Sequence, residues 1–273
     1  MKELTLKELQ DFCLNILQEV HEFCENNDIK YSLYAGSMLG AIRHKGYIPW
    51  DDDIDIIMPR PDYDRFCKEF RSNNYHLIHA GNDVNCYLAF ARVCDLNRTV
   101  IETYSPWCSC TTGCWIDIFP ADGFPADKDD QYIQYDKCIR LRKSLINLRH
   151  AKSHFYGKIW TRIRLLITKV LTLNGYGAVK VVNTLLEAIK TYDYNQESYW
   201  ASLTNVRDYN EWKHHPIETF ATCSLMKFED RQFRVMDGYD IVLRQRYGDY
   251  MKMPPSDEQK PKQSYIHFYW KEK

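Results

Sequence analysis

Residues 45–63 read KGYIPWDDDIDIIMPRPDY, and this stretch decides the fold assignment. Four aspartates fall within residues 51–55 and lead directly into the apolar run IIM. Pro59 and Pro61 follow, and proline ends a central strand because it has no N–H to donate. The sequence therefore predicts a buried strand over residues 53–58 with carboxylates crowded at its start.

The side chains of a strand alternate between its two faces. If residues 51–57 are extended, Asp51, Asp53 and Asp55 share one face, the isoleucines between them enter a core, and Asp52 points away and is dispensable. Three carboxylates at this spacing repel one another, and partial burial would neutralise them unless a cation is present. Oxygen ligands suit Mg²⁺ or Mn²⁺. The alternative is a solvated acidic turn that precedes a strand.

Two features elsewhere in the chain fit such a site. Gly36 and Ser37 separate a predicted strand (31–35) from a predicted helix (38–43), where backbone N–H groups can bind a phosphate. Asp117 is a lone carboxylate in the apolar stretch WIDIF, so it needs a partner if it is buried. A metal shared with Asp53 and Asp55 would supply that partner; a salt bridge or a backbone hydrogen bond is the alternative.

A glycine-serine turn, a D-x-D strand and a third carboxylate on a later strand, in this order, are typical of nucleotidyltransferases. We predict an α+β fold with α/β character. Residues 1–125 would form a nucleotidyltransferase-like core of a mixed β-sheet with flanking helices. Residues 126–273 would be mainly helical, pack on that core as one compact unit and complete the substrate pocket.

The rest of the predicted core follows from periodicity. Thr5 and Glu8 form a capping box, after which apolar residues recur at helical spacing from Leu9 to Phe23. We expect a helix at 62–70, strands at 75–79, 87–93 and 98–103, and a strand at 115–119 that Pro120 closes. The pattern turns helical from about residue 129 to 191.

Composition limits the partners and the compartment. The net charge of the 273 residues is -1, which gives no global field to hold nucleic acid. The N-terminus shows no secretory signal, no apolar run reaches the roughly 20 residues of a membrane span, and the ten cysteines form no compact framework. The expected compartment is the cytoplasm. The cationic, amphipathic stretch 158–173 suits the surface of an anionic membrane, or alternatively covers the catalytic core.

Three blocks of the chain resemble the LicD family: YSLYAGSMLGAIRHKGYIPWDDDIDIIMPRPDYDRF, WIDIFPADGFP and LRQRYGDYMKMPP. Members of this family are bacterial phosphotransferases with a nucleotidyltransferase-like core. The resemblance implies transfer of phosphocholine from CDP-choline, or of a similar alcohol phosphate, to a sugar of lipopolysaccharide or teichoic acid. The animal fukutin-related proteins are similar and transfer ribitol phosphate from CDP-ribitol.

On this reading Asp53 and Asp55 hold Mg²⁺ against the donor pyrophosphate, and Asp117 is the third ligand. Asp51 is a further ligand or the base that accepts the proton of the sugar hydroxyl. Whether Asp51 or Asp117 is the base stays open from the sequence.

The expected phosphate contacts come from two places. Gly36 and Ser37 would hold a donor phosphate, and Arg92, on the predicted strand 87–93, is a weaker phosphate candidate. Three cationic residues lie at the end of the predicted helix: Arg43, His44 and Lys45. They would neutralise the charge of the CMP leaving group. The alternative is that they form a solvated basic loop.

Some aromatic and sulfur residues carry open alternatives. The quaternary ammonium of choline binds against the faces of aromatic rings. The candidates for such a binding pocket are Trp50, Trp107 and Trp115, and each of them could instead belong to the hydrophobic core. Three cysteines could form part of a zinc site: Cys108, Cys110 and Cys114. The alternative is that they are free thiols.

Three other functions compete with phosphotransfer from a CDP-alcohol. A nucleotidyltransferase would attack an NTP and release pyrophosphate. A D-x-D glycosyltransferase would carry its acidic motif after a nucleotide-binding half, whereas here the motif comes about 50 residues in, after Gly-Ser. A scaffold with a relic site would have no need to keep repelling carboxylates together.

Overall fold

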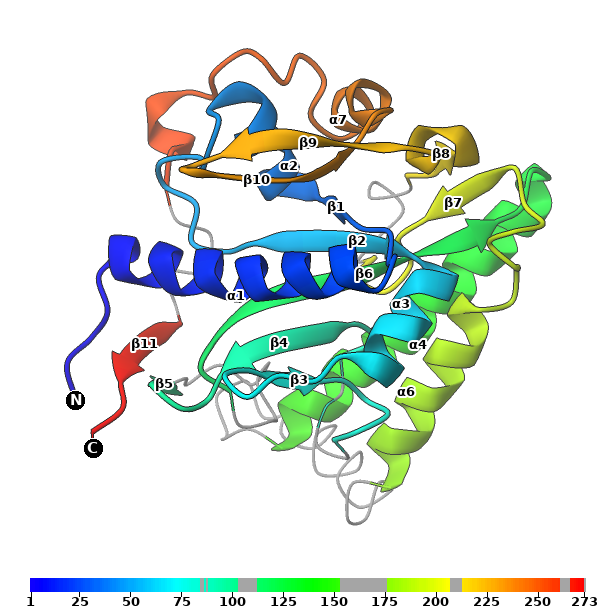
Figure 1. The fold of residues 1–273 in the computed structure, drawn as a ribbon. Helices are drawn as coiled ribbons and strands as arrows, with labels where there is room; N and C mark the ends of the chain where they lie inside the picture. The colour runs from blue at the N-terminus through cyan, green and yellow to red at the C-terminus, as the bar shows by residue number, and fades with distance from the viewer. Residues whose placement is uncertain are drawn as a thin grey trace.

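The computed structural model describes residues 1–83, 86, 88–102, 112–152, 176–206, 213–260 and 266–272. Helices and strands are mixed along the chain, which confirms the predicted α+β class (Figure 1). The helices are α1 (Leu6–Asn26), α2 (Ala35–Arg43), α3 (Arg60–Glu69), α4 (Lys128–Lys152), α6 (Tyr176–Ile189) and α7 (Tyr239–Tyr247), with short 3₁₀ turns η3 (Ile217–Phe220) and η4 (Ser256–Glu258).

The strands form one large sheet and two small ones. They are β1 (Ser32–Leu33), β2 (Asp55–Pro59), β3 (His76–Ile78), β4 (Ala91–Asp95), β5 (Thr99–Glu102), β6 (Cys114–Phe124), β7 (Tyr199–Ala201), β8 (His215–Pro216), β9 (Cys223–Phe228), β10 (Arg231–Met236) and β11 (His267–Trp270).

The large sheet is mixed, as predicted. Its order is β1-β2-β6-β4-β3, with β7 paired to the C-terminal part of β6 and β8 paired to β7. Strands β2 and β6 are parallel, and the other pairs are antiparallel. The small sheets pair β9 with β10 and β5 with β11, which brings the C-terminal strand beside the N-terminus (Figure 1).

Helix α1 covers one face of the large sheet (Figure 1). Its capping box is present, because the Thr5 hydroxyl accepts the Glu8 N–H and the Glu8 carboxylate accepts the Thr5 N–H. The predicted apolar stripe is buried from Leu9 to Val20. Phe23, at the end of the stripe, is half-buried and packs edge-on against the rings of Phe66 in α3 and Phe70 just after it.

Strand β6 runs five residues beyond the predicted stop at Phe119 and passes through Pro120. The Asp117 N–H donates to the Ile54 carbonyl, so Asp117 directs its backbone N–H toward β2. Every second residue of a strand faces the same neighbour, so Ile118 and Pro120 direct their backbone N toward the opposite edge of β6, where β4 lies. The first residue of β4, Ala91, pairs with Ile118, and β4 does not reach as far as Pro120. Pro120 therefore faces a place where no ladder hydrogen bond from β4 is required, and the prediction that it closes the strand was wrong.

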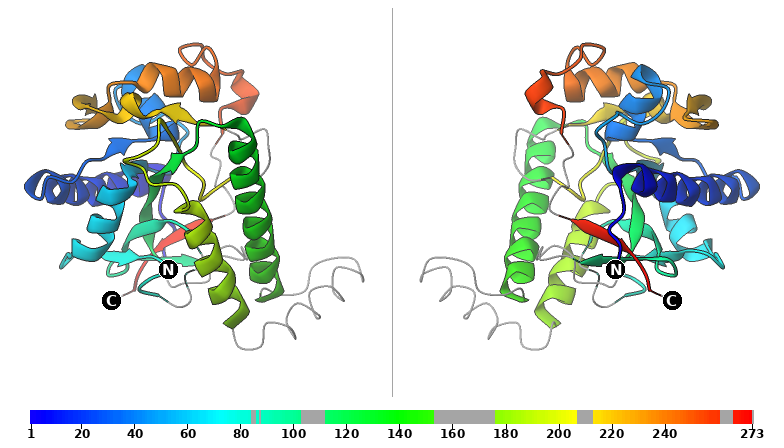
Figure 2. Two further views of the ribbon diagram at one scale, coloured as in Figure 1. Left: turned by 90° about the vertical axis from the view of Figure 1, so that its right-hand side faces the viewer. Right: turned by 90° about the vertical axis from the view of Figure 1, so that its left-hand side faces the viewer.

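The C-terminal part is not only helical. Helices α4 and α6 lie side by side and enclose a second apolar core (Figure 2). The described part of residues 126–273 also contains strands β7 to β11, and β7 extends the same sheet as β2 and β6. The predicted boundary at residue 125 lies just after β6, which ends at Phe124. Strands from both predicted halves pair with β6, namely β2 and β4 from the first and β7 from the second.

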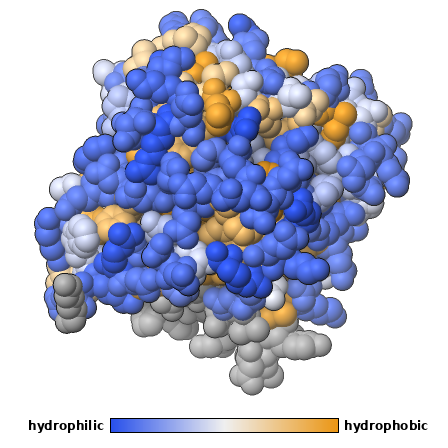
Figure 3. Space-filling model, viewed as in Figure 1, coloured by the Kyte–Doolittle hydropathy of each residue, from blue (hydrophilic) through white to orange (hydrophobic). Residues whose placement is uncertain are grey.

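No helix among the described residues is long and apolar enough to cross a membrane. On the face shown in Figure 3, hydrophobic residues are scattered among hydrophilic ones rather than gathered in one patch. The stretch 158–173, together with Trp107, Cys108 and Cys110, lies outside the described residues.

Candidate active site

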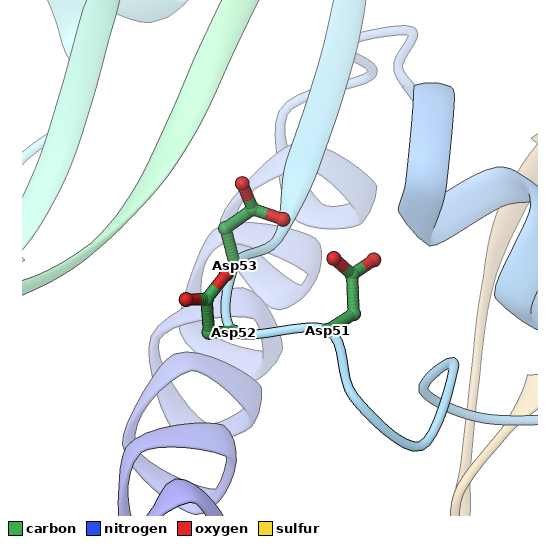
Figure 4. A group of neighbouring side chains, drawn as sticks. All are labelled: Asp51, Asp52 and Asp53. Carbon is green, nitrogen blue, oxygen red and sulfur yellow. The ribbon is translucent and has the colours of Figure 1, made fainter. Parts of the chain in front are cut away.

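An acidic cluster lies on the loop between α2 and β2. One carboxylate oxygen from each of Asp51, Asp52 and Asp53 lies within 4.8 Å of the others (Figure 4). Asp51 is buried, and the other two are half-buried. No other three His, Cys, Asp or Glu side chains in the described ranges come together in this way. Hard carboxylate oxygens at such spacing fit a divalent cation of the Mg²⁺ type.

The place of Asp52 corrects the prediction that it points away from the site. Strand β2 begins only at Asp55, so residues 51–54 are a loop and do not follow the alternation of a strand. As a result the Asp52 carboxylate joins those of Asp51 and Asp53. The alternation rule correctly buries Ile54 and Ile56 but does not order the aspartates.

Asp55 and Asp117 are direct neighbours in register across the parallel strands β2 and β6. The pKa of the Asp55 carboxyl lies well above its usual value, because the group is withdrawn from water and because Asp53, Asp117 and Asp51 repel its charge; Arg246 acts in the opposite direction. The loop cluster and the strand pair therefore belong to one acidic site. A divalent cation would relieve the repulsion.

Asp117 has a partner in the protein itself. The Arg92 Nε donates to Asp117 Oδ1 at 2.7 Å, and both side chains are buried. The Arg92 guanidinium also lies over the Trp115 ring, 4.2 Å from its centroid. The salt bridge considered as an alternative for Asp117 is thus present. The metal set Asp53, Asp55 and Asp117, and phosphate binding by Arg92, stay predictions.

Gly36 and Ser37 lie in the first turn of α2 rather than in a break before the helix. The Ser37 hydroxyl accepts the Asp55 N–H at 2.9 Å. A Cβ on Gly36 would come 2.6 Å from Asp51 Oδ2, so only glycine allows this approach. Ala35 has φ 47°, a left-handed conformation that costs about 1–2 kcal/mol in an alanine. The helix start and the acidic loop are therefore fitted closely to each other.

The cationic group Arg43, His44 and Lys45 lies at the other end of α2. The helix is nine residues long, roughly 13 Å at 1.5 Å per residue. The Arg43 Nη1 donates to the carbonyls of Tyr250 and Lys252, and its Nε donates to His44. The Lys45 Nζ donates to the Ile42 carbonyl. In the structure Arg43 and Lys45 hold backbone carbonyls and the His44 ring accepts from Arg43, and contact of these three residues with a leaving group stays a prediction.

Arg246 is a site residue that the sequence reasoning missed. It lies near the end of α7, it is exposed, and it is the cation that acts on the charge of Asp55. Its guanidinium lies 5.5 Å from the Tyr34 ring centroid and 5.7 Å from that of Tyr247. Its position could have been suspected only from the third block, LRQRYGDYMKMPP, which contains it.

Of the candidate aromatic and sulfur residues, the structure describes Trp50, Trp115 and Cys114. Trp115 is buried between Arg92 and Phe268, whose ring centroid is 5.1 Å away, so it is part of the core. Trp50 is half-buried and packs against the main core. Burial raises the pKa of the Cys114 thiol to about 12, which keeps it protonated at neutral pH.

Comparison with known proteins identifies the family. Residues 28–147 match the family described as LicD/FKTN/FKRP, nucleotidyltransferase domain. The lipopolysaccharide cholinephosphotransferase LicD of Haemophilus influenzae is 34% identical over 270 residues, which are 96% of this chain and 97% of that protein. The chain belongs to the LicD family.

Shorter similarities reach two uncharacterised proteins. An uncharacterised protein of Rickettsia typhi is 36% identical over 67 residues, 23% of this chain and 22% of that protein. One of Rickettsia prowazekii is 49% identical over 41 residues, 15% of each chain. The LicD family match covers the acidic residues 51–55 and Asp117 but stops before Arg246, whereas the alignment with the Haemophilus LicD spans nearly the whole length.

Proposed function

We propose that this LicD-family protein transfers phosphocholine from CDP-choline to a sugar hydroxyl of a cell-surface glycan, lipopolysaccharide in the first instance, and releases CMP. One observation carries the proposal: the 34% identity with a lipopolysaccharide cholinephosphotransferase extends over nearly the full length of both chains. The family resemblance leaves two variants of this proposal open. The transferred group could be a related alcohol phosphate, and the acceptor could be a teichoic acid.

The acidic site is the proposed centre of the reaction. Asp53, Asp55 and Asp117, with Asp51 and Asp52 beside them, would hold Mg²⁺ or Mn²⁺. When bound, such an ion neutralises phosphate charge and helps to align the two phosphates of the donor. The raised pKa of Asp55 and the close oxygens of the 51–53 loop support this, because both are unfavourable without a cation.

The transfer is a displacement at one phosphorus atom. The acceptor sugar oxygen forms a bond to the phosphorus that carries choline, the bond from that phosphorus to the bridging oxygen breaks, and CMP leaves. The hydroxyl proton must pass to a base. We assign it to Asp51, because the Arg92 guanidinium is paired with Asp117 and an adjacent cation opposes protonation of its carboxylate.

Two further groups are proposed to bind donor phosphate. The guanidinium of Arg246 lies against the rings of Tyr34 and Tyr247 and acts on the charge of Asp55, so it is placed to donate to a phosphate oxygen bound at the acidic site. The Ser37 hydroxyl accepts from the Asp55 N–H and keeps its own proton to donate. Neutralising the CMP oxygens is then a task for Arg246 in place of the cations at the far end of α2.

The test is a donor panel. Purified protein with Mg²⁺ is incubated with CDP-choline, CDP-ribitol or CDP-glycerol and with lipopolysaccharide from a strain that lacks phosphocholine, and CMP is measured. We expect CMP from CDP-choline only, together with choline on the glycan. The variants Asp53→Asn and Asp55→Asn should lose at least about a hundredfold in rate, since each removes charge from the site that stabilises the transition state. An exposed control is Asp230→Asn.

The rival functions give different products in the same assay. Pyrophosphate released from CTP would show a nucleotidyltransferase, and transfer of a sugar from a nucleotide sugar would show a glycosyltransferase. Wild-type rates in folded Asp53→Asn and Asp55→Asn variants would contradict the proposed site even if phosphocholine is transferred.

A further inference from the structure

A cavity lies away from the acidic site, at the other end of β2. Its volume is about 330 Å³, and it opens between α3, α6 and the residues before β4. The acidic cluster precedes Asp55 at the start of β2, whereas Arg60, which lines the cavity, follows Pro59 at its end. Figure 1 shows α3 and α6 on this side of the sheet.

Part of the lining is apolar. Leu88, Ala89 and Phe90 come from the segment that leads into β4, Tyr63 comes from α3, and Leu186 comes from α6. The first four are buried and Leu186 is half-buried. A small flat apolar group would contact these side chains in the cavity without displacing them.

The charged lining is mainly cationic. Lys68, Lys190 and Arg60 line the cavity, with Asp64 as the carboxylate among them. The Lys190 Nζ contacts Asp64 at 2.9 Å, and both side chains are nearly half exposed, so water screens this pair strongly. A ligand anion at the mouth would find Lys68 and Lys190 within the same lining.

Arg60 is held deeper in the wall. Its Nε donates to the buried Asp122 at 2.6 Å, and its guanidinium lies over the Tyr63 ring at 4.9 Å. The Arg60 Nη2 and the Asp122 Oδ2 are buried, and neither has a hydrogen-bond partner among the described residues. Both atoms are closed off from solvent, and the Arg60 Nη1 donates to Asp64 Oδ1 at 3.4 Å, so the guanidinium adds positive charge to the wall of the cavity and offers no free donor to a ligand.

His79 supplies a hydrogen-bond donor to the lining. Its Nδ1 accepts the Gly81 N–H at 3.1 Å, and a Cβ on Gly81 would come 2.9 Å from the ring. Burial lowers the pKa of His79, so the ring is neutral near pH 7. With Nδ1 acting as an acceptor, the proton must sit on Nε2, which donates to no other described group.

We propose that this cavity is a second binding site, for a small molecule that joins one phosphate or carboxylate group to a flat apolar part. Lys68, Lys190 and the His79 Nε2–H meet the anion, and the wall from Leu88 to Phe90 meets the apolar part. This site is separate from the acidic site and does not depend on the function proposed for it.

The test uses phenyl phosphate and benzoate as probes, with benzyl alcohol as the neutral analogue, titrated calorimetrically into the full chain with EDTA present. At least one anion should bind saturably, and benzyl alcohol should bind about tenfold more weakly, the value of one charge-assisted hydrogen bond. Which of the two anions binds distinguishes a phosphate from a carboxylate ligand.

Matched variants locate the binding. Leu186→Trp should abolish it by filling the cavity, and Lys190→Gln should weaken it about tenfold. The corresponding controls, Ile133→Trp and Lys180→Gln, change exposed residues outside the lining and should bind as the wild type does. The proposal is overturned if neither anion binds, if Leu186→Trp binds normally, or if CMP displaces the probe.

Discussion

Each aspartate of the acidic loop is placed by a different local constraint. The Gln10 Nε2 donates to the Asp51 carbonyl at 2.9 Å, and Gly36 leaves room for the Asp51 side chain. The Asp55 N–H is tied to Ser37 at the start of α2. The two aspartates between these anchors, Asp52 and Asp53, are carried on a loop that is fixed at both ends. The loop, rather than a strand, brings the three carboxylates together.

This geometry makes a prediction for Asp52, which strand alternation would leave idle. If its carboxylate helps to bind the metal, Asp52→Asn should weaken Mn²⁺ binding by the isolated protein about tenfold, since one charged ligand contact is worth roughly 1.5–3 kcal/mol. Titration followed by the electron spin resonance of free Mn²⁺ measures this directly. Asp230→Asn, a change at an exposed acid outside the cluster, is the control. Equal Mn²⁺ affinity in Asp52→Asn and wild type would remove Asp52 from the site.

At the scale of elements, α2 joins the acidic loop to the C-terminal part of the chain. Its N-terminal turn contacts Asp51 and Asp55, and its last residue, Arg43, binds the carbonyls of Tyr250 and Lys252. These carbonyls lie just beyond α7, which ends at Tyr247 and is followed by Gly248 with φ 66°; Arg246 lies in the last turn of this helix. The position of Arg246 against Tyr34 therefore depends on this docking.

Replacing Arg43 with alanine should loosen the segment after α7. The variant loses two hydrogen bonds from a charged donor, so local opening of residues 248–252 should become easier by about 1.5–3 kcal/mol. Amide hydrogen exchange of that segment reports the change.

Arg65→Ala is the matched control for Arg43→Ala, because Arg65 binds two backbone carbonyls elsewhere, those of Asn27 and Asp28. It should speed exchange near residue 28 and leave 248–252 unchanged. Unchanged exchange at 248–252 in Arg43→Ala would show that other contacts hold α7 against α2.

The elements differ in how far the sequence predicts them. Helix α1 follows from local signals alone, the Thr5–Glu8 capping box and a regular apolar stripe. The length of β6 does not, because a proline is tolerated at 120 only when the neighbouring strand has already ended. The same limit applies at the site: Asp53, Asp55 and Asp117 are visible as a pattern, whereas the placement of Asp52 and Arg246 depends on a loop and on a helix about 190 residues away.

For the whole molecule, the acidic site draws on three distant parts of the chain. Residues 34–55 supply the first turn of α2 and the acidic loop, Arg92 and Asp117 come from the centre of the sheet, and Arg246 comes from α7. Strands β7 and β8 carry the chain from the second core back toward α7. The buried His215 on β8 lies within electrostatic reach of Arg246. The stability of this region therefore bears on the site.

His215 makes a prediction about stability and pH. Its ring lies 4.5 Å from that of Trp200, and its buried Nδ1 has no hydrogen-bond partner among the described residues. Burial, with His214, Arg246 and Lys213 adding to it, lowers the pKa of His215 to about 3. An unfolded histidine has a pKa of about 6.5. Between these two values the unfolded chain binds the proton and the folded chain does not, so acid favours unfolding.

The free energy of unfolding should therefore fall as the pH drops below about 6.5, with a slope from this residue of at most about 1.4 kcal/mol per pH unit. His215→Phe keeps a ring against Trp200 and removes the titrating group, so its unfolding free energy should fall less steeply between pH 6.5 and pH 4.5. Urea unfolding across that range measures both slopes, with the exposed His76→Phe as the control. The same slope in wild type and His215→Phe would mean that His215 takes up its proton in the folded protein as readily as in the unfolded chain, and that β8 opens to water more than its burial indicates.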